Sequence, residues 1–115
     1  MSVKYVNAKA DLTATSLTTL YQPSTDPVTT AIVKSLIISE DAGATPTITI
    51  TLVDTDAAIF NLFKDKAIAS KATTELLTQP LVMEESEILK VQASDANELH
   101  VIASILEIQP REVTT

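Results

Sequence analysis

The segment from Thr45 to Val53 shows the clearest alternation of polar and apolar positions in this chain. Its polar positions are Thr47, Thr49 and Thr51, and its apolar positions are Ile48, Ile50 and Leu52. A period of two predicts a β-strand with a buried aliphatic face and a hydroxyl face. The hydroxyl face lies either against water, as in many antiparallel sheets with one wet side, or against a partner.

A second predicted strand lies just upstream, at 31–39 (AIVKSLIIS). Leu36 and Ile38 are its expected core positions because they share one face. We expect residues 40–44 (EDAGA) to join the two strands as a hairpin loop. Gly43, the only glycine of the chain, is expected to supply a positive φ in that loop.

Further strands are expected on both sides of this pair. They are predicted at 3–8, 16–22, 73–77, 81–83, 88–93 and 99–108, with turns at 23–27, 84–86 and 94–97. The last of these strands has Leu99, Val101, Ala103 and Ile105 on one face and further apolar residues on the other. A strand that is apolar on both faces is either central in its sheet or buried against a neighbouring subunit.

The segment 54–70 fits two patterns. A suitable N-cap is followed by apolar residues near helical spacing: Asp54, then Ile59, Leu62, Phe63 and Ala67. In the alternative, 58–64 is a strand, Asp65 is a turn, and 67–69 begins the next strand. The turn-like 54–57 (DTDA) and the strand-rich surroundings favour the second interpretation.

This pattern of about seven to nine short strands, spaced about ten residues apart, predicts an all-β fold. The expected architecture is an antiparallel β-sandwich, jelly-roll-like. A chain of 115 residues is long enough for a hydrophobic core without disulfides or metal. We expect one domain over 1–109 and a short polar tail over 110–115.

Composition argues against several classes of function. The absence of cysteine excludes disulfides and cysteine-ligated metal sites. A net charge of −7, with scattered basic residues, argues against nucleic acid as a partner. Aromatic residues make up 3% of the chain and tryptophan is absent, which disfavours glycan binding. Neither a bilayer-spanning apolar run nor the apolar region of a signal peptide occurs, so we expect a soluble protein made in a cytoplasm, without a membrane partner.

The residues that commonly carry chemistry are sparse. His100, the only histidine, lies in a predicted strand without a Ser-His-Asp pattern, which indicates a surface or interface histidine instead of a general base. The pair Asp54 and Asp56 offers two carboxylates to a divalent cation, but it lacks the further ligands of a calcium loop. We favour the simpler explanation that the two aspartates form Asx hydrogen bonds in a turn.

The acidic turn at 84–87 contains three glutamates, Glu84, Glu85 and Glu87. Paired acids of this kind hydrolyse glycosides, but that reaction needs a cleft with sugar-stacking aromatic residues, and none lies nearby. A single glycine also excludes a phosphate-cradling loop. We therefore expect no enzyme activity, no cofactor and no metal site.

Several short strings occur in a characteristic order along the chain. They are ATSLTTLYQP, IVKSLIIS, ELLTQPLVME, ILKVQAS and VIASILEI. In this order and spacing, over nearly the whole chain, they resemble a group of small tailed-bacteriophage virion structural proteins that are common in aquatic phages. Members of that group often have Gly-Asp where this chain has Ser86-Glu87, and a glycine near Lys71. These departures concern turns and leave the strand pattern intact.

The resemblance implies a β-sandwich subunit that is present in many copies on a phage particle and is therefore located in the virion. Our leading interpretation is a non-enzymatic decoration or cement subunit that stabilises the capsid. Its expected partners are the major capsid protein, other virion proteins and further copies of itself. A neck, head–tail joining or tail-adaptor ring protein is the alternative within the virion, and a carbohydrate-binding module is the alternative from another class.

The two ends of the chain are the expected contact segments. Both are β-prone and suited to adding a strand to the edge of a neighbour's sheet. The residues concerned are Val3, Lys4, Tyr5 and Val6 near the N-terminus, and Arg111, Glu112, Val113 and Thr114 near the C-terminus.

Overall fold

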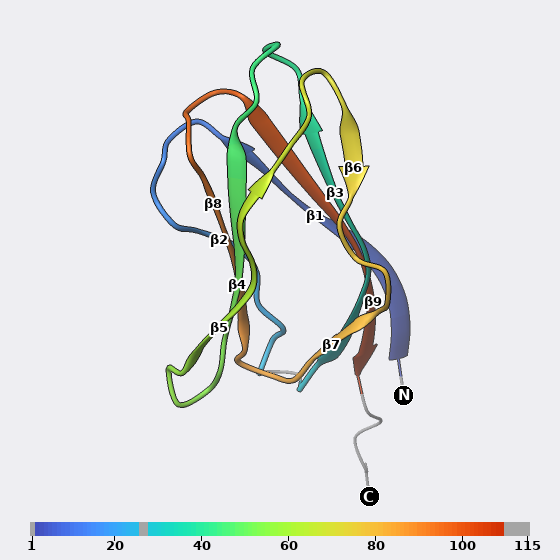
Figure 1. Ribbon diagram of the computed structural model, residues 1–115. Coiled ribbons are helices and arrows are strands. Elements are labelled where there is room, and N and C mark those ends of the chain that lie inside the picture. Colours follow the sequence, from blue (N-terminus) through green and yellow to red (C-terminus); the bar gives the residue numbers. More distant parts are fainter. Residues whose placement is uncertain (1, 26–27, 110–115) are drawn as a thin grey trace, which may run out of the picture.

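The computed structural model describes residues 2–25 and 28–109, and these residues form two antiparallel β-sheets that face each other (Figure 1). The strands are β1 (Ser2–Leu12), β2 (Thr18–Tyr21), β3 (Thr30–Glu40), β4 (Thr47–Val53), β5 (Ile59–Ala67), β6 (Thr73–Glu75), β7 (Leu81–Met83), β8 (Ile88–Ala93) and β9 (Leu99–Gln109). The described part of the chain contains no helix, and so none with the length and apolar character that crossing a membrane requires.

The order of the strands is that of a jelly roll. One sheet has the order β1-β9-β3-β6, with β7 also paired to β3, and the other has the order β2-β8-β4-β5. Successive strands cross from one sheet to the other, except at the β4–β5 hairpin and at β6 and β7, which pair with different parts of β3. The predicted all-β, jelly-roll-like sandwich is therefore confirmed.

The core lies between the two sheets. Leu36 and Ile38, the predicted core positions of β3, have exposed fractions of 1% and 0%. The predicted inner face of the last strand is confirmed as well: Leu99, Val101, Ala103 and Ile105 are buried. Of the two explanations given for the two apolar faces of β9, the central position holds, since β9 pairs with β1 on one side and β3 on the other.

The first strand is longer than predicted. β1 runs from Ser2 to Leu12, and the expected strand ended at residue 8. Its pairing with β9 continues without a register shift from Ser2 opposite Gln109 to Leu12 opposite Leu99. The neighbouring strand, and not the local sequence, therefore sets the length of β1.

Residues 40–44 do not form the predicted hairpin. β3 lies in the five-stranded sheet and β4 in the four-stranded sheet, so the loop crosses between sheets. Gly43 does have the predicted positive φ, of 86°. The crossing is held by the buried carboxylate of Glu40, which accepts hydrogen bonds from the backbone amides of Ala42 (3.2 Å), Gly43 (3.0 Å), Ala44 (3.1 Å) and Lys71 (2.8 Å).

The segment 54–70 contains a strand, β5 (Ile59–Ala67), where the favoured interpretation placed one at 58–64, and the helical alternative is wrong. Two details of the strand interpretation also need correction. Asp65 is not a turn but part of a bulge inside β5, where it has a φ of 51° and its amide donates to Thr49 Oγ1 at 3.1 Å. β5 ends at Ala67, residues 68 and 69 follow it, and the next strand does not start until Thr73.

The hydroxyl face of β4 is less open than predicted. Thr47 and Thr49 are half-buried, but Thr51 is only 3% exposed. Thr51 lies between Asn61 of β5 and Lys90 of β8, and its Oγ1 donates to Asn61 Oδ1 at 3.3 Å. Thr51 is therefore covered by the flanking strands β5 and β8, although the alternation within β4 placed it on the polar face.

Within the described part of the chain, five residues other than glycine have positive φ values: Ala57, Asp65, Lys71, Ser86 and Asn97. Ser86 has a φ of 68° and Lys71 a φ of 54°. Side chains with a Cβ are strained in the left-handed region, and glycine is not.

We expect Ser86→Gly to raise the free energy of unfolding by about 0.5–1 kcal/mol, because it removes this strain. Chemical denaturation followed by circular dichroism measures the change. Ser104→Gly is the matched control, since Ser104 lies inside β9, where glycine weakens a strand. Equal effects of the two substitutions would contradict the explanation from backbone strain.

Candidate functional site

The four N-terminal residues predicted to contact a partner lie in β1 and alternate between its two sides. Val3 and Tyr5 lie on the outer face of the five-stranded sheet, where they are 51% and 76% exposed. Val6 packs against the core, and Lys4 Nζ lies 3.8 Å from Glu107 Oε1. The C-terminal residues Arg111, Glu112, Val113 and Thr114 lie outside the described residues.

Tyr5 belongs to a row of large apolar side chains that crosses the outer face of the five-stranded sheet. The row, which we call the outer apolar row, consists of Tyr5 on β1, Leu106 on β9, Ile32 on β3 and Val82 on β7. Residues paired directly across strands point to the same side of a sheet. Val82 is 56% exposed, so the row is open to solvent at both ends.

The neighbouring rows extend this surface along the strands. On one side lie Val3, Ile108 and Thr30, and on the other side lie the small polar residues Asn7, Ser104 and Ser35. The next row consists of Lys9, Ile102, Ile37 and Glu75. Large exposed apolar areas on a soluble protein mark sites of interaction.

Next to Ile102 the face contains a hollow of about 310 Å³. Its lining residues are Lys9, Ala10, Asp11, His100, Val101 and Ile102. His100 lies between two carboxylates, with Nε2 at 3.1 Å from Asp11 Oδ1 and Nδ1 at 3.6 Å from Asp41 Oδ2. A satisfied surface histidine, as expected from the sequence, explains this geometry without catalysis.

The free edge of β1 is the second feature suited to a partner. β1 has 11 residues without proline or glycine, and among residues 2–25 and 28–109 it pairs with β9 only, without a register shift. The other sheet edges are short or irregular: β2, β6 and β7 have 4, 3 and 3 residues, and β5 is bulged next to Lys64 and Lys66. Proteins normally protect long edges, so the bare edge of β1 is a candidate for strand addition.

Glu107 and Tyr21 join the two sheets near the outer apolar row. Tyr21 of β2 donates its phenolic hydrogen to Glu107 Oε2 of β9. Burial, together with the hydrogen bond to Glu107 and the negative charge of this carboxylate, raises the pKa of Tyr21. The phenol therefore stays protonated, and the contact is structural.

The acidic residues of the predicted candidate sites hold turns. Asp54 Oδ1 accepts from the amide of Thr55 at 2.8 Å, and Asp56 Oδ1 accepts from the amide of Ala58 at 3.2 Å. Glu87 Oε1 likewise accepts from the amide of Glu84 at 2.7 Å. Among the described residues no cluster of three potential ligands suits a metal ion.

Glu75 and Glu98 are the remaining acids with a shifted pKa. Burial raises the pKa of Glu75, but hydrogen bonds from Ser35 and from the amides of Leu36 and Leu77 outweigh it and bring the pKa below its ordinary value. Burial raises the pKa of Glu98, and the negative charges of Asp95 and Glu40 raise it further. Glu98 Oε1 is buried without a hydrogen-bond partner in the part of the chain described here.

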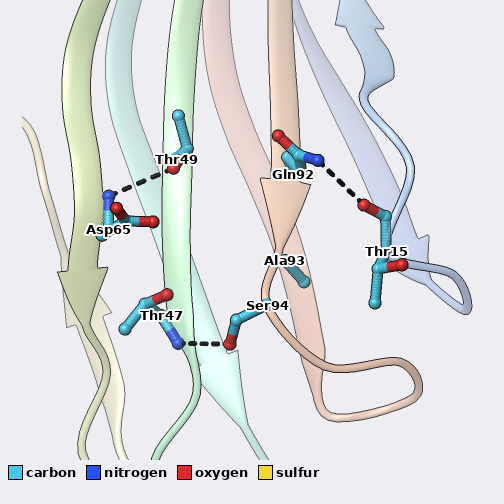
Figure 2. A pocket seen from close by; sticks show the side chains of 7 residues that line it. All are labelled: Thr15, Thr47, Thr49, Asp65, Gln92, Ala93 and Ser94. Carbon is cyan, nitrogen blue, oxygen red and sulfur yellow. Dashed lines mark hydrogen bonds between the residues drawn. The ribbon is translucent and has the colours of Figure 1, made fainter.

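A polar pocket of about 300 Å³ lies on the outer face of the four-stranded sheet (Figure 2). It is lined by Thr15, Thr47, Thr49, Asp65, Gln92, Ala93 and Ser94. Several of these groups are already engaged: Gln92 Nε2 donates to the carbonyl of Thr15 at 3.0 Å, and Ser94 Oγ accepts from the amide of Thr47 at 2.8 Å. The lining contains no aromatic ring on which a sugar would stack.

Neither a family model nor a curated protein matches the chain. The solved structures that resemble it weakly include the following two. One is the CBM22-1–GH10 part of xylanase 10B from Clostridium thermocellum in complex with xylohexaose, with a TM-score of 0.41 and 9% identity over 95% of this chain and 27% of that chain. The other is infectious bursal disease virus, Gt strain, with a TM-score of 0.38 and 9% identity over 93% of this chain and 30% of that chain. The chain thus spans less than a third of either structure.

Most residues of the outer face were not predicted from the sequence as contact residues. Val3 and Tyr5 were predicted because they lie near the N-terminus, whereas Ile32, Val82 and Leu106 join them through pairing across strands. The sequences of β3 and β9 did indicate an apolar outer face, because both have large apolar residues at consecutive positions. Only the pairing shows that these residues line up.

Proposed function

We propose that this chain is a non-enzymatic structural protein of a phage particle and that it decorates and stabilises the capsid. The observation that carries the proposal is the five-stranded sheet, which combines an exposed apolar outer face with the bare edge of β1. A bridging subunit needs more than one contact surface, and this sheet provides two. The resemblance of the sequence to phage virion proteins supports the same conclusion.

The edge of β1 is the surface we assign to the shell. An extended segment of a shell protein pairs with this edge, and the main-chain hydrogen bonds provide the affinity. A subunit that binds the assembled shell, but not the separated shell proteins, stabilises the shell by mass action. Many such contacts on one particle multiply a modest affinity.

The chemistry of the described residues supports a binding protein over an enzyme. The carboxylates of Glu40, Glu75 and Glu87 accept hydrogen bonds from backbone amides, which occupies the groups that acid–base catalysis requires. A carbohydrate-binding module is the second candidate, and the polar pocket on the four-stranded sheet is the observation in its favour. That pocket has no aromatic ring on which a sugar could stack, so we prefer the capsid decoration protein to the carbohydrate-binding module.

The first test is the number of copies of this chain in purified particles, measured by quantitative mass spectrometry against the major shell protein. A decoration protein is expected at about one copy for every one to three shell subunits. A few copies to about a dozen per particle would overturn decoration in favour of a neck or tail ring. Absence from the particles would overturn a virion role, and binding to a glycan array would then support the second candidate.

A proline pair tests the role of the β1 edge. Successive backbone amides of a strand point to opposite sides, so one of Asn7→Pro and Ala8→Pro removes an amide that faces the free edge, and the other removes one that pairs with β9. The variant that keeps the fold, as judged by circular dichroism, is expected to bind bare shells at least about tenfold more weakly. Unchanged binding by the folded variant would exclude the edge as the contact.

A further inference from the structure

The outer face of the five-stranded sheet fits a second copy of the same chain. We infer that two copies pack face to face through this surface, related by a two-fold axis that runs along the row of Asn7, Ser104 and Ser35. This inference concerns the isolated protein and does not depend on the proposed role in a phage particle.

The size of the face matches a stable interface. β1, β3 and β9 have 11 residues each, which corresponds to a length of about 36 Å at the usual rise per residue. Three strands side by side are about 14 Å wide, and the short β6 and β7 extend the face beside β3, so the face covers about 600 Å². Specific interfaces remove about 800 Å² from each partner.

The distribution of charge favours a copy of this chain as the occupant. A net charge of −7 makes two copies repel each other wherever their acidic surfaces meet. The paired residues of three successive rows of this face, from the row of Val3 to the row of Asn7, are uncharged, and Lys34, the exposed residue at the bulge of β3 beside Ser35, adds a positive charge. Two copies can therefore meet on this face without opposing their acidic surfaces.

The shape of the face is self-complementary about the proposed axis. The residues on the axis are small and polar, which permits close approach. A half-turn about it places Tyr5 of one copy over the row of Lys9 and Ile102 of the second copy, because both rows lie two residues from Asn7. Tyr5 is 76% exposed, and the hollow of about 310 Å³ lies beside Ile102.

The chemistry of the hollow suits a tyrosine. Ile102 provides an apolar wall, and the aliphatic stem and ammonium group of Lys9 lie favourably against an aromatic face. Asp11, which lines the same hollow and contacts His100 through Oδ1, offers its other carboxylate oxygen as an acceptor to the phenolic hydroxyl. Sheets that pack face to face interdigitate their side chains in this way.

Sedimentation velocity on the isolated chain tests the inference. We expect a dimer with a dissociation constant of about 1 µM. Tyr5→Ala and Ile102→Lys are each expected to raise that constant about 30-fold or more. Phe60→Ala is the control, since Phe60 is 54% exposed on the four-stranded sheet and lies outside the proposed interface.

Cysteine cross-linking tests the axis independently, because the chain has no cysteine of its own. Residues on a two-fold axis meet their own counterparts, so Ser104→Cys is expected to form a disulfide-linked dimer under mild oxidation. Thr49→Cys, on the outer face of the other sheet, is the matched control and is expected to remain monomeric.

Three results would overturn the inference. The first is a wild-type chain that stays monomeric at about 1 mM. The second is a dimer whose affinity is unchanged by both Tyr5→Ala and Ile102→Lys. The third is cross-linking of Thr49→Cys as efficient as that of Ser104→Cys. If a monomeric chain nevertheless binds bare shells through the outer apolar row, the occupant is the shell protein and not a second copy.

Discussion

Glu40→Gln is expected to lower the melting temperature by about 10 °C, because it deprives a crossing loop of its acceptors. Oε1 of Glu40 accepts from the amides of Gly43 and Lys71, and Oε2 accepts from the amides of Ala42 and Ala44. A glutamine amide replaces one oxygen with a donor. Two backbone amides that face the buried side chain are then left without an acceptor. Thermal unfolding by circular dichroism at pH 7 measures the effect.

The effect of this substitution is expected to depend on pH. The hydrogen bond from the amide of Lys71, with those from Ala44, Gly43 and Ala42, holds the pKa of Glu40 below its ordinary value of 4.5. The unfolded chain therefore takes up a proton at higher pH than the folded one, and this contribution to stability is present above pH 4.5 and is lost as the pH falls through the folded pKa. The difference in melting temperature between the wild type and Glu40→Gln should therefore become smaller below pH 4.5.

Glu85→Gln is the matched control, since Glu85 is exposed in the turn before β8 and the substitution removes the same charge. Its melting temperature should stay close to that of the wild type. A similar loss of stability in both variants would show that net charge, and not the hydrogen bonds of the loop, governs the result.

Ile105→Ala is expected to lower the free energy of unfolding by about 2–5 kcal/mol, because it leaves a cavity between the sheets. Ile105 is fully buried, on the inner face of the central strand β9. Urea denaturation should show a lower midpoint with an unchanged slope, since the surface exposed on unfolding changes little.

Leu106→Ala, the next residue along β9, provides the control from the opposite face. Leu106 belongs to the outer apolar row and is half-buried. At a protein concentration below the dissociation constant of the dimer, its loss should cost about 1 kcal/mol or less. If Leu106→Ala cost as much as Ile105→Ala under these conditions, the outer row would be part of the core of the isolated subunit.

These two adjacent residues show how the fold relates to the inferred interface. β9 presents one apolar face to the core and another to the outside, so the same strand can stabilise the subunit and join it to a neighbour. Leu106→Ala is accordingly expected to weaken the dimer more than it weakens the fold. In the proposed capsid role, the bare β1 edge and the outer face would then serve two different partners.

Local patterns predicted much of the fold because each depends on neighbouring residues. β7 and β8 were predicted at 81–83 and 88–93, where they occur. The positive φ of Gly43 followed from the only glycine in a loop. The helical alternative for 54–70 arose because a few apolar residues on a short strand also satisfy helical spacing.

Long-range relations account for what the patterns missed. The loop at 40–44 was assigned to a hairpin because short loops often join paired strands, but the choice between pairing and crossing depends on which sheet receives β4. The bulge at Asp65 depends on register with β4, and the burial of Thr51 depends on its neighbours Asn61 and Lys90. None of these contacts is local in sequence.

The chain alone determines an all-β sandwich, the inner face of its central strand and the scarcity of catalytic groups, because these follow from alternation and composition. Tertiary structure decided that Tyr5, Leu106, Ile32 and Val82 form one row and that the edge of β1 is bare. Both depend on strand order and register, which are set when segments distant in the sequence pair and bury their common core.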